Sequence, residues 1–229
     1  MQTIVLLHSP LLGPYSWDAV ARALRAEGHR AVVPDLRPAL TGPPPFLDRL
    51  REAAVAAVEH PTTLVAHSAA GPLVPAIAEA LGPAAAATIF VDARLPHPGL
   101  SWLESLDGER ATRLREMATD GELPPWNTWF PAEALAAEIP DDEVRERFTA
   151  DLRPTPFALC AEKTPSPTPI FDGLPHAYVR LSPAYEGDAD TAERAGWHVV
   201  RRNSVHLAPL TRADEVVNAV HEIFDRHRT

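Results

Sequence analysis

Short apolar runs rich in β-branched residues alternate with segments of helical periodicity, and this alternation limits the possible folds more than any other feature. Consecutive apolar positions are typical of strands that are covered on both faces, as in a parallel sheet. Strands that alternate with helices predict right-handed crossovers. The runs lie at residues 3–7, 31–33, 62–66, 88–91, 177–181 and 198–201. We therefore expect an α/β fold, a mostly parallel sheet with helices on both faces.

The alternation breaks after Asp92. Residues from 94 to about 175 are rich in proline, tryptophan and charge, with helical patches at 110–118 and 141–152 and no clear strand. We interpret this stretch as a helical cap inserted into a single domain whose core comprises residues 1–93 and 176–229. A chain of 229 residues fits one sizeable core and is short for two ordinary enzyme domains.

The charge balance argues against nucleic acid or an anionic membrane as a partner, because 21 basic and 31 acidic residues give a formal charge of −10. The single cysteine, Cys160, excludes an internal disulfide, and the first twelve residues lack the features of a secretory signal. We expect a cytoplasmic monomer or homodimer that acts on a small molecule. No HExxH, paired Cys/His spacing or glycine-rich phosphate loop occurs, so we expect no metal and no cofactor.

Residues 63–72, TLVAHSAAGP, combine an apolar run, a turn of small residues centred on Ser68 and a helix-forming stretch. A nucleophilic serine on a tight strand-to-helix turn needs small neighbours, since strand and helix backbones approach closely there. The usual pattern has glycine two positions before and after the serine, where this chain has Ala66 and Ala70. Two interpretations stay open at this point: a nucleophile elbow, or a serine that only caps the helix.

Four segments resemble the α/β-hydrolase superfamily in order and spacing, over essentially the whole chain: VLLHSPLLGPYSW, AVVPDL, LVAHSAAG and NSVHLAPL. The absence of strands before Thr3 and the phrase TIFVDARLP are most similar to its small esterase and hydroxynitrile-lyase branch. In that superfamily the triad runs serine, acid, histidine. The resemblance therefore implies Ser68 as nucleophile and His206, in the turn after the last strand, as base.

The triad acid departs from the family pattern. It usually lies in the loop after the strand at 177–181, but that loop reads SPAYEGDAD, with Ala184 or Tyr185 near the expected position and Glu186 displaced. Some members of the superfamily carry the acid at the end of the strand that follows the elbow, which here is Asp92. We favour Asp92 over Glu186. The alternative for Asp92 is a turn cap at the end of a strand.

The expected oxyanion hole also differs from the family pattern. The resemblance implies one donor at the Ala69 N–H and a second two residues past His8, where Pro10 has no N–H to donate. Leu11 after a local shift, or the Ser9 side chain, could replace the second donor. Otherwise the hole is incomplete.

The favoured hypothesis is a serine hydrolase that cleaves a small to medium, largely apolar ester, lactone or thioester through an acyl-enzyme on Ser68. Trp102, Trp126 and Trp129 fall in the expected cap, where they could line an apolar substrate pocket. Two alternatives use the same fold. One is a lyase or cyclase that uses the same serine and histidine for proton transfer, and the other is a non-catalytic ligand-binding protein.

Overall fold

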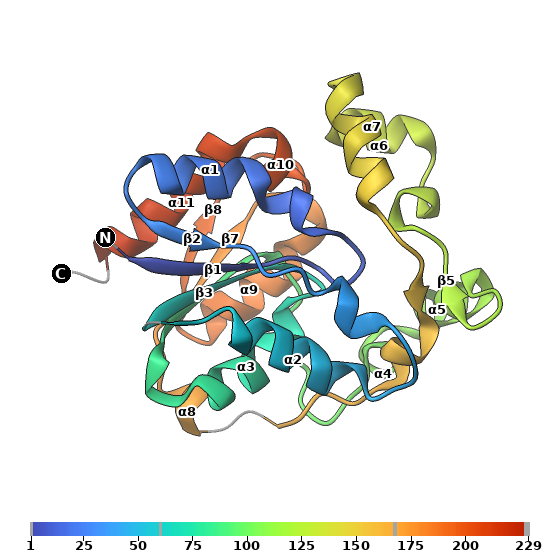
Figure 1. Ribbon diagram of the computed structural model, residues 1–229, viewed down its shortest axis with the longest axis horizontal. Helices are drawn as coiled ribbons and strands as arrows, with labels where there is room; N and C mark the ends of the chain where they lie inside the picture. The colour runs from blue at the N-terminus through green and yellow to red at the C-terminus, as the bar shows by residue number, and fades with distance from the viewer. Residues whose placement is uncertain (1, 60, 167–168, 227–229) are drawn as a thin grey trace.

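The computed structural model describes residues 2–59, 61–166 and 169–226, and its centre is one six-stranded sheet in the order β2-β1-β3-β4-β7-β8 (Figure 1). The strands are β1 (Thr3–Leu7), β2 (Arg30–Val32), β3 (Thr62–Ser68), β4 (Ala85–Ala93), β7 (His176–Arg180) and β8 (His198–Arg201). Each neighbouring pair is parallel. All carboxyl ends therefore lie at one edge of the sheet, and the expected α/β fold is confirmed.

Helices cover both faces of the sheet because alternate strand residues point to opposite sides. Ile4 and Leu6 pack with residues of α1 (Asp18–Ala26) and α11 (Ala213–Arg226). Their neighbours Val5 and Leu7 pack on the other face. The helices of that second face are α2 (Phe46–Ala56), α3 (Val74–Leu81) and α9 (Glu186–Arg194). Among the described residues, no helix has the length and apolar character needed to cross a lipid bilayer.

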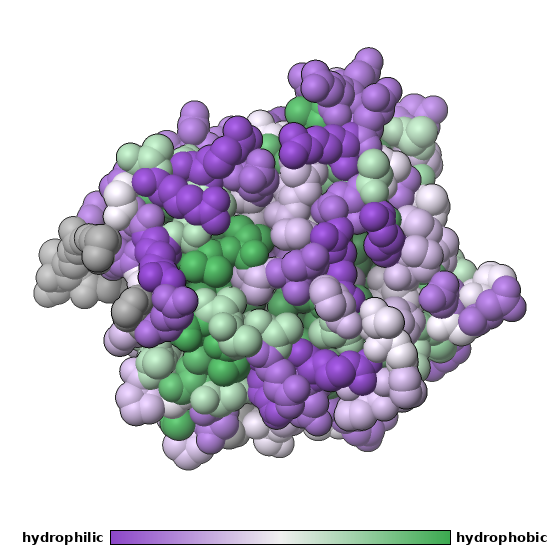
Figure 2. Space-filling view, viewed as in Figure 1, coloured by the Kyte–Doolittle hydropathy of each residue, from purple (hydrophilic) through white to green (hydrophobic). Residues whose placement is uncertain are grey.

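Most of the segment between β4 and β7 projects beside the carboxyl edge of the sheet, whereas its last helix lies against α3 (Figure 1). Its helices are α4 (Trp102–Ser105), α5 (Gly108–Met117), α6 (Ala132–Glu138), α7 (Asp142–Asp151) and α8 (Pro169–Asp172), with 3₁₀ turns at Trp126–Trp129 and Phe157–Ala161. Figure 2 shows hydrophilic side chains over α7, whereas Phe148 of the same helix is buried against Leu12 and Leu207 of the core. This contact attaches the outer helices to the sheet domain.

One expectation for this segment is wrong, since it contains strands. β5 (Glu122–Leu123) and β6 (Thr155–Pro156) form a two-stranded antiparallel sheet. Strands of two residues carry no period that a sequence pattern can reveal, and the proline in β6 argues against a strand in sequence. Only the contact between two distant segments makes them a sheet.

Several boundaries also differ from the sequence pattern. β4 begins at Ala85 within the alanine-rich run, and β3 continues to Ser68. Each extension pairs with the neighbouring strand, Ala85 with Thr62 and Ser68 with Ala93, so this backbone pairing overrides the weak β propensity of alanine. The helix after the elbow starts as a 3₁₀ turn, Gly71–Leu73, before α3 begins at Val74.

Candidate active site

Ser68 is the last residue of β3 and has a φ of 57°. This is a strained conformation for a residue with a side chain, and such strain is typical of functional turns. Ala66 and Ala70 are completely buried around it. A Cβ atom added to Gly71 would lie 1.9 Å from the carbonyl oxygen of Arg94. The close approach that the elbow requires therefore occurs at Gly71, three positions after the serine.

His206 lies after β8 and reaches the carboxyl end of β4. Its Nδ1 lies 3.1 Å from Oδ2 of Asp92, whose side chain is completely buried. The same carboxylate accepts hydrogen bonds from the Leu181 N–H at 2.6 Å, the Ser182 N–H at 3.1 Å and the Ser182 hydroxyl at 2.6 Å. Buried acceptors need such partners, and these bonds hold the carboxylate toward the imidazole.

The other candidate acid, Glu186, points to a different set of partners. Its two oxygens lie 2.8 Å from Arg180 and 2.8 Å from Arg201. Arg180 and Arg201 are the last residues of β7 and β8, and Glu186 bridges the two side chains. Of the two carboxylates, the structure brings only Asp92 into contact with His206 within the described residues.

Two aromatic rings stack on the His206 imidazole, and the Trp126 ring lies tilted to it at 6.2 Å. The Tyr185 ring is nearly parallel to it, with centroids 4.9 Å apart and an angle of 7°, and the His67 ring lies at 4.5 Å. His67 Nε2 lies 3.0 Å from the His206 carbonyl oxygen, a contact in which the ring nitrogen donates. Burial first, and the nearby His206 second, hold the pKa of His67 well below its ordinary value. His67 is therefore a neutral ring that supports the imidazole.

Tyr185 also contacts the serine, with its hydroxyl oxygen 3.4 Å from Ser68 Oγ. Within the described part of the chain, Ser68 Oγ makes this hydrogen bond and none to His206. Catalytic hydrogen bonds are often long or misaligned until substrate binds, so this arrangement is compatible with a serine and base pair. Sequence reasoning missed Tyr185, although it stands near the position expected for the family acid.

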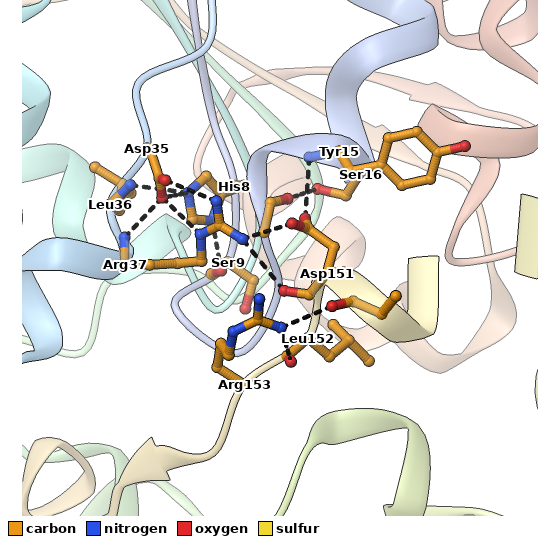
Figure 3. A network of polar contacts seen from close by, with 12 residues as sticks. His8, Ser9, Tyr15, Ser16, Asp35, Leu36, Arg37, Asp151, Leu152 and Arg153 are labelled. Carbon is orange, nitrogen blue, oxygen red and sulfur yellow. Dashed lines mark hydrogen bonds and ion pairs between the residues drawn. The ribbon is translucent and has the colours of Figure 1, made fainter. Parts of the chain in front are cut away.

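The loop after β1 is held by the polar network of Figure 3. His8 Nδ1 donates to the Ser9 carbonyl oxygen at 2.8 Å, and its Nε2 accepts from the Leu36 N–H at 3.0 Å. Burial lowers the pKa of His8 to about 4, so the ring is neutral. Arg37 then bonds both Asp35 and Asp151, and this ties the loop after β2 to α7.

In this loop, none of the residues considered for the second oxyanion donor is available to a substrate. The Leu11 N–H donates to Ser9 Oγ at 3.2 Å, a local turn typical of serine. The Ser9 side chain is completely buried and does not face the cavity described below, so it is not placed to contact substrate. Pro10 has no N–H. The Ala69 N–H donates to no group among the described residues and remains available.

A cavity of about 550 Å³ opens above the elbow. Its floor includes Ser68, Ala69, Leu11, Tyr185 and His206. The expected aromatic residues all reach it from the segment between β4 and β7, and its wall there includes Trp102, Leu106, Trp126, Trp129, Phe130 and Leu135. Pro10 instead lines two other cavities, of about 50 Å³ and about 600 Å³. The cavity above the elbow has the volume and the mostly apolar lining of a small-molecule site.

A family model described as the alpha/beta hydrolase family matches residues 4–219. The chain belongs to the alpha/beta hydrolase family. The resemblance at the superfamily level is thereby confirmed. A comparison with curated proteins gives no match.

Solved structures of three α/β proteins share the fold of this alpha/beta hydrolase. An extracellular α/β-hydrolase from a Paenibacillus species is 17% identical, with a TM-score of 0.74 over 96% of this chain and 99% of that one. A pyrethroid hydrolase from Sphingobium faniae is 17% identical, with a TM-score of 0.75 over 98% and 97%. Tomato methylketone synthase I, in complex with 2-tridecanone, is 15% identical, with a TM-score of 0.74 over 99% of each chain.

One possible metal-ligating group exists in the described part of this alpha/beta hydrolase, away from the cavity. Ligand atoms of Glu27, His29 and His221 lie within 4.8 Å of one another, and Glu27 pairs with His221 Nε2 at 2.9 Å. His29 directly precedes β2. The group therefore sits at the amino ends of the strands, opposite Ser68, and takes no part in the site.

Proposed function

We propose that this protein is a serine hydrolase that cleaves a small to medium, largely apolar carboxylic ester, lactone or thioester through an acyl-enzyme on Ser68. The observation that carries the proposal is the contact between His206 Nδ1 and the buried Asp92 carboxylate, beside a strained serine that faces a cavity. The ends of three strands thereby supply a nucleophile, a base and a group that orients the base, the set used in nucleophilic catalysis.

Each residue then has a distinct role in acylation. Asp92 accepts the Nδ1–H of His206, which leaves Nε2 as the basic nitrogen. Nε2 takes the proton of Ser68 as Oγ attacks the carbonyl carbon, and it later delivers that proton to the departing oxygen. The Ala69 N–H stabilises the oxyanion. Water, activated by the same base, finally hydrolyses the acyl-enzyme.

The cavity wall supports an uncharged substrate. Its charged residues already have partners: Arg94 pairs with Asp188 at 2.8 Å, and Glu138 accepts from the Leu207 N–H at 2.8 Å. Arg110 lies 3.4 Å from Asp107. Apart from these residues, the surface offered to a ligand is dominated by tryptophan, phenylalanine and leucine.

A second candidate is a lyase or cyclase that uses Ser68 and His206 for proton transfer. It is favoured by the engagement of the Leu11 N–H with Ser9 and by a serine hydroxyl that, among the described residues, does not bond His206. The similarity in fold to an enzyme named a synthase fits this alternative. The Asp92–His206 contact argues against the third alternative, a protein that only binds ligand.

The decisive experiment combines covalent labelling with turnover. We expect a fluorophosphonate probe and a short-chain p-nitrophenyl ester to modify wild-type protein at Ser68, with the intact mass rising by the phosphonyl or acyl group. Ser68→Ala should fold normally, take up no label and lose at least about a thousandfold in turnover, because nothing replaces the nucleophile.

The matched control is Ser166→Ala, an exposed serine outside the cavity, which should label and turn over like wild type. Ser68→Ala protein that retains more than about a tenth of the activity would rule out covalent catalysis, since loss of a nucleophile costs far more. Turnover without any covalent adduct would favour the lyase or cyclase.

A further inference from the structure

Tyr185 lies where the serine, the base and the cavity meet. Its hydroxyl oxygen is 3.4 Å from Ser68 Oγ, its ring is stacked on the His206 imidazole, and it forms part of the cavity wall. A phenol in contact with a reacting atom is a candidate hydrogen-bond donor.

The order of the strands shows from which side Tyr185 approaches Ser68. β1 lies on one side of β3, whereas β4, β7 and β8 lie on the other. Tyr185 ends the 3₁₀ turn after β7, and His206 follows β8. The tyrosine hydroxyl and the base therefore reach the serine from the same side, opposite the loop after β1. In acyl transfer, the oxygen that leaves is the one that faces the base.

The loop after β7, where the family usually carries the triad acid, can provide such a donor in this protein. Asp92 already binds His206 from the end of β4, so the loop after β7 need not supply the carboxylate. It supplies backbone and hydroxyl donors to Asp92 through Leu181 and Ser182 instead. Three residues after Ser182, the chain places the Tyr185 ring over the imidazole.

Tyr185 is suited to donate rather than to transfer a proton. Burial raises the pKa of its hydroxyl to about 12, so the group stays protonated at neutral pH. Within the described residues, the Ser68 hydroxyl is its hydrogen-bond partner. Once Ser68 Oγ is bonded to the acyl carbon, the phenol O–H is available to another oxygen on the same side.

We propose that Tyr185 is a further catalytic residue, which donates a hydrogen bond to the leaving oxygen during acylation and suits the enzyme to unactivated alkyl esters. The inference rests on the function proposed above. In that step the bond from Ser68 Oγ to the carbonyl carbon forms and the carbon–oxygen bond to the alcohol breaks. The serine proton passes through His206 Nε2 to the departing oxygen. Tyr185 keeps its own proton and stabilises the negative charge on that oxygen.

The test compares Tyr185→Phe with wild type on two esters of the same acid, an ethyl ester and a p-nitrophenyl ester. The nitrophenolate leaves without help, whereas the ethoxide needs its charge stabilised. Loss of one hydrogen bond to a developing charge should lower kcat/KM for the ethyl ester by about 10- to 100-fold. We expect kcat/KM for the p-nitrophenyl ester to stay close to the wild-type value. Since kcat/KM reports steps up to acylation, deacylation does not mask the difference.

Phenylalanine keeps the ring that packs on His206, so the variant should fold, and its thermal midpoint checks this. The matched control is Tyr15→Phe, which removes a phenol hydroxyl outside the cavity wall and should leave both esters unaffected. An equal loss on the two esters would overturn the proposal, because Tyr185 would then act on Ser68 or on the shape of the cavity. A variant with no loss of kcat/KM on either ester would also overturn the proposal. Neither result would contradict the proposed function. Wild-type protein that is inactive on both esters would overturn both the proposed function and the role of Tyr185.

Discussion

The Asp92 carboxylate accepts hydrogen bonds from Leu181, from Ser182 and from His206 while completely buried. A buried acceptor with partners on every side has a single orientation, and that orientation fixes the imidazole. Asp92 itself has a φ of 41°, uncommon for a residue with a side chain. Backbone strain is usually found at functional sites. Asp92 and Ser68 are both strained, and we propose a chemical role for each.

We expect Asp92→Asn to lower turnover by up to ~10⁴, because an amide offers an N–H toward Nδ1 and favours the wrong imidazole tautomer. Glu186→Gln should remain close to wild type, since Glu186 contacts arginines and not His206. Turnover of one ester at neutral pH measures both. The reverse result would move the acid to the loop after β7, and two mild effects would mean that His206 is oriented by another group.

At the scale of elements, the elbow depends on the contact between the start of the 3₁₀ turn after β3 and the chain after β4. Gly71 faces the carbonyl oxygen of Arg94, and the Arg94 N–H donates to the Ser68 carbonyl oxygen at 3.0 Å. The turn that carries the serine is therefore held by backbone of the neighbouring strand.

Gly71→Ala should destabilise the protein by about 1–3 kcal/mol or more, because the methyl group would force strand and turn apart. Urea unfolding measures the change in the free energy of unfolding. Gly187→Ala is the control, since an added Cβ there meets no atom within 4 Å and lies on a helix, where alanine is favoured over glycine. Equal stability of Gly71→Ala and wild type would show that the close approach is not required.

At the scale of the whole molecule, buried histidines link stability to pH. Burial is the main cause that lowers the pKa values of His8, His67 and His176. In the unfolded chain these residues return to an ordinary pKa near 6.5. As the pH falls below that value, the unfolded state binds protons that the folded state does not, so the folded state loses stability.

We expect the free energy of unfolding to fall between pH 7 and pH 5, with His8 alone contributing about 2 kcal/mol to the loss. The sign follows from a folded pKa of about 4 against 6.5 when unfolded: the contribution is complete above pH 6.5 and disappears toward pH 4. Urea unfolding at both pH values measures it. His8→Gln, which cannot titrate, should show a smaller loss, whereas His97→Gln should match wild type. The same loss in His8→Gln and wild type would exclude His8 as the source.

The alternation of apolar runs with helical segments was enough to predict the parallel sheet, because these patterns are local and repeat along the chain. Small residues around Ser68 indicated a close strand-to-helix turn, and the place of His206 after the last run put it at the carboxyl edge. Local patterns do not distinguish Asp92 from Glu186, because Asp92 and His206 are 114 positions apart, and the preference for Asp92 rested on the family resemblance. Three contacts became visible only in the tertiary structure. Asp92 binds His206, and the Leu11 N–H donates to Ser9. The Tyr185 hydroxyl lies against Ser68, 117 positions away. Those contacts depend on which side chains packing brings within a few ångströms, and no local pattern carries that information.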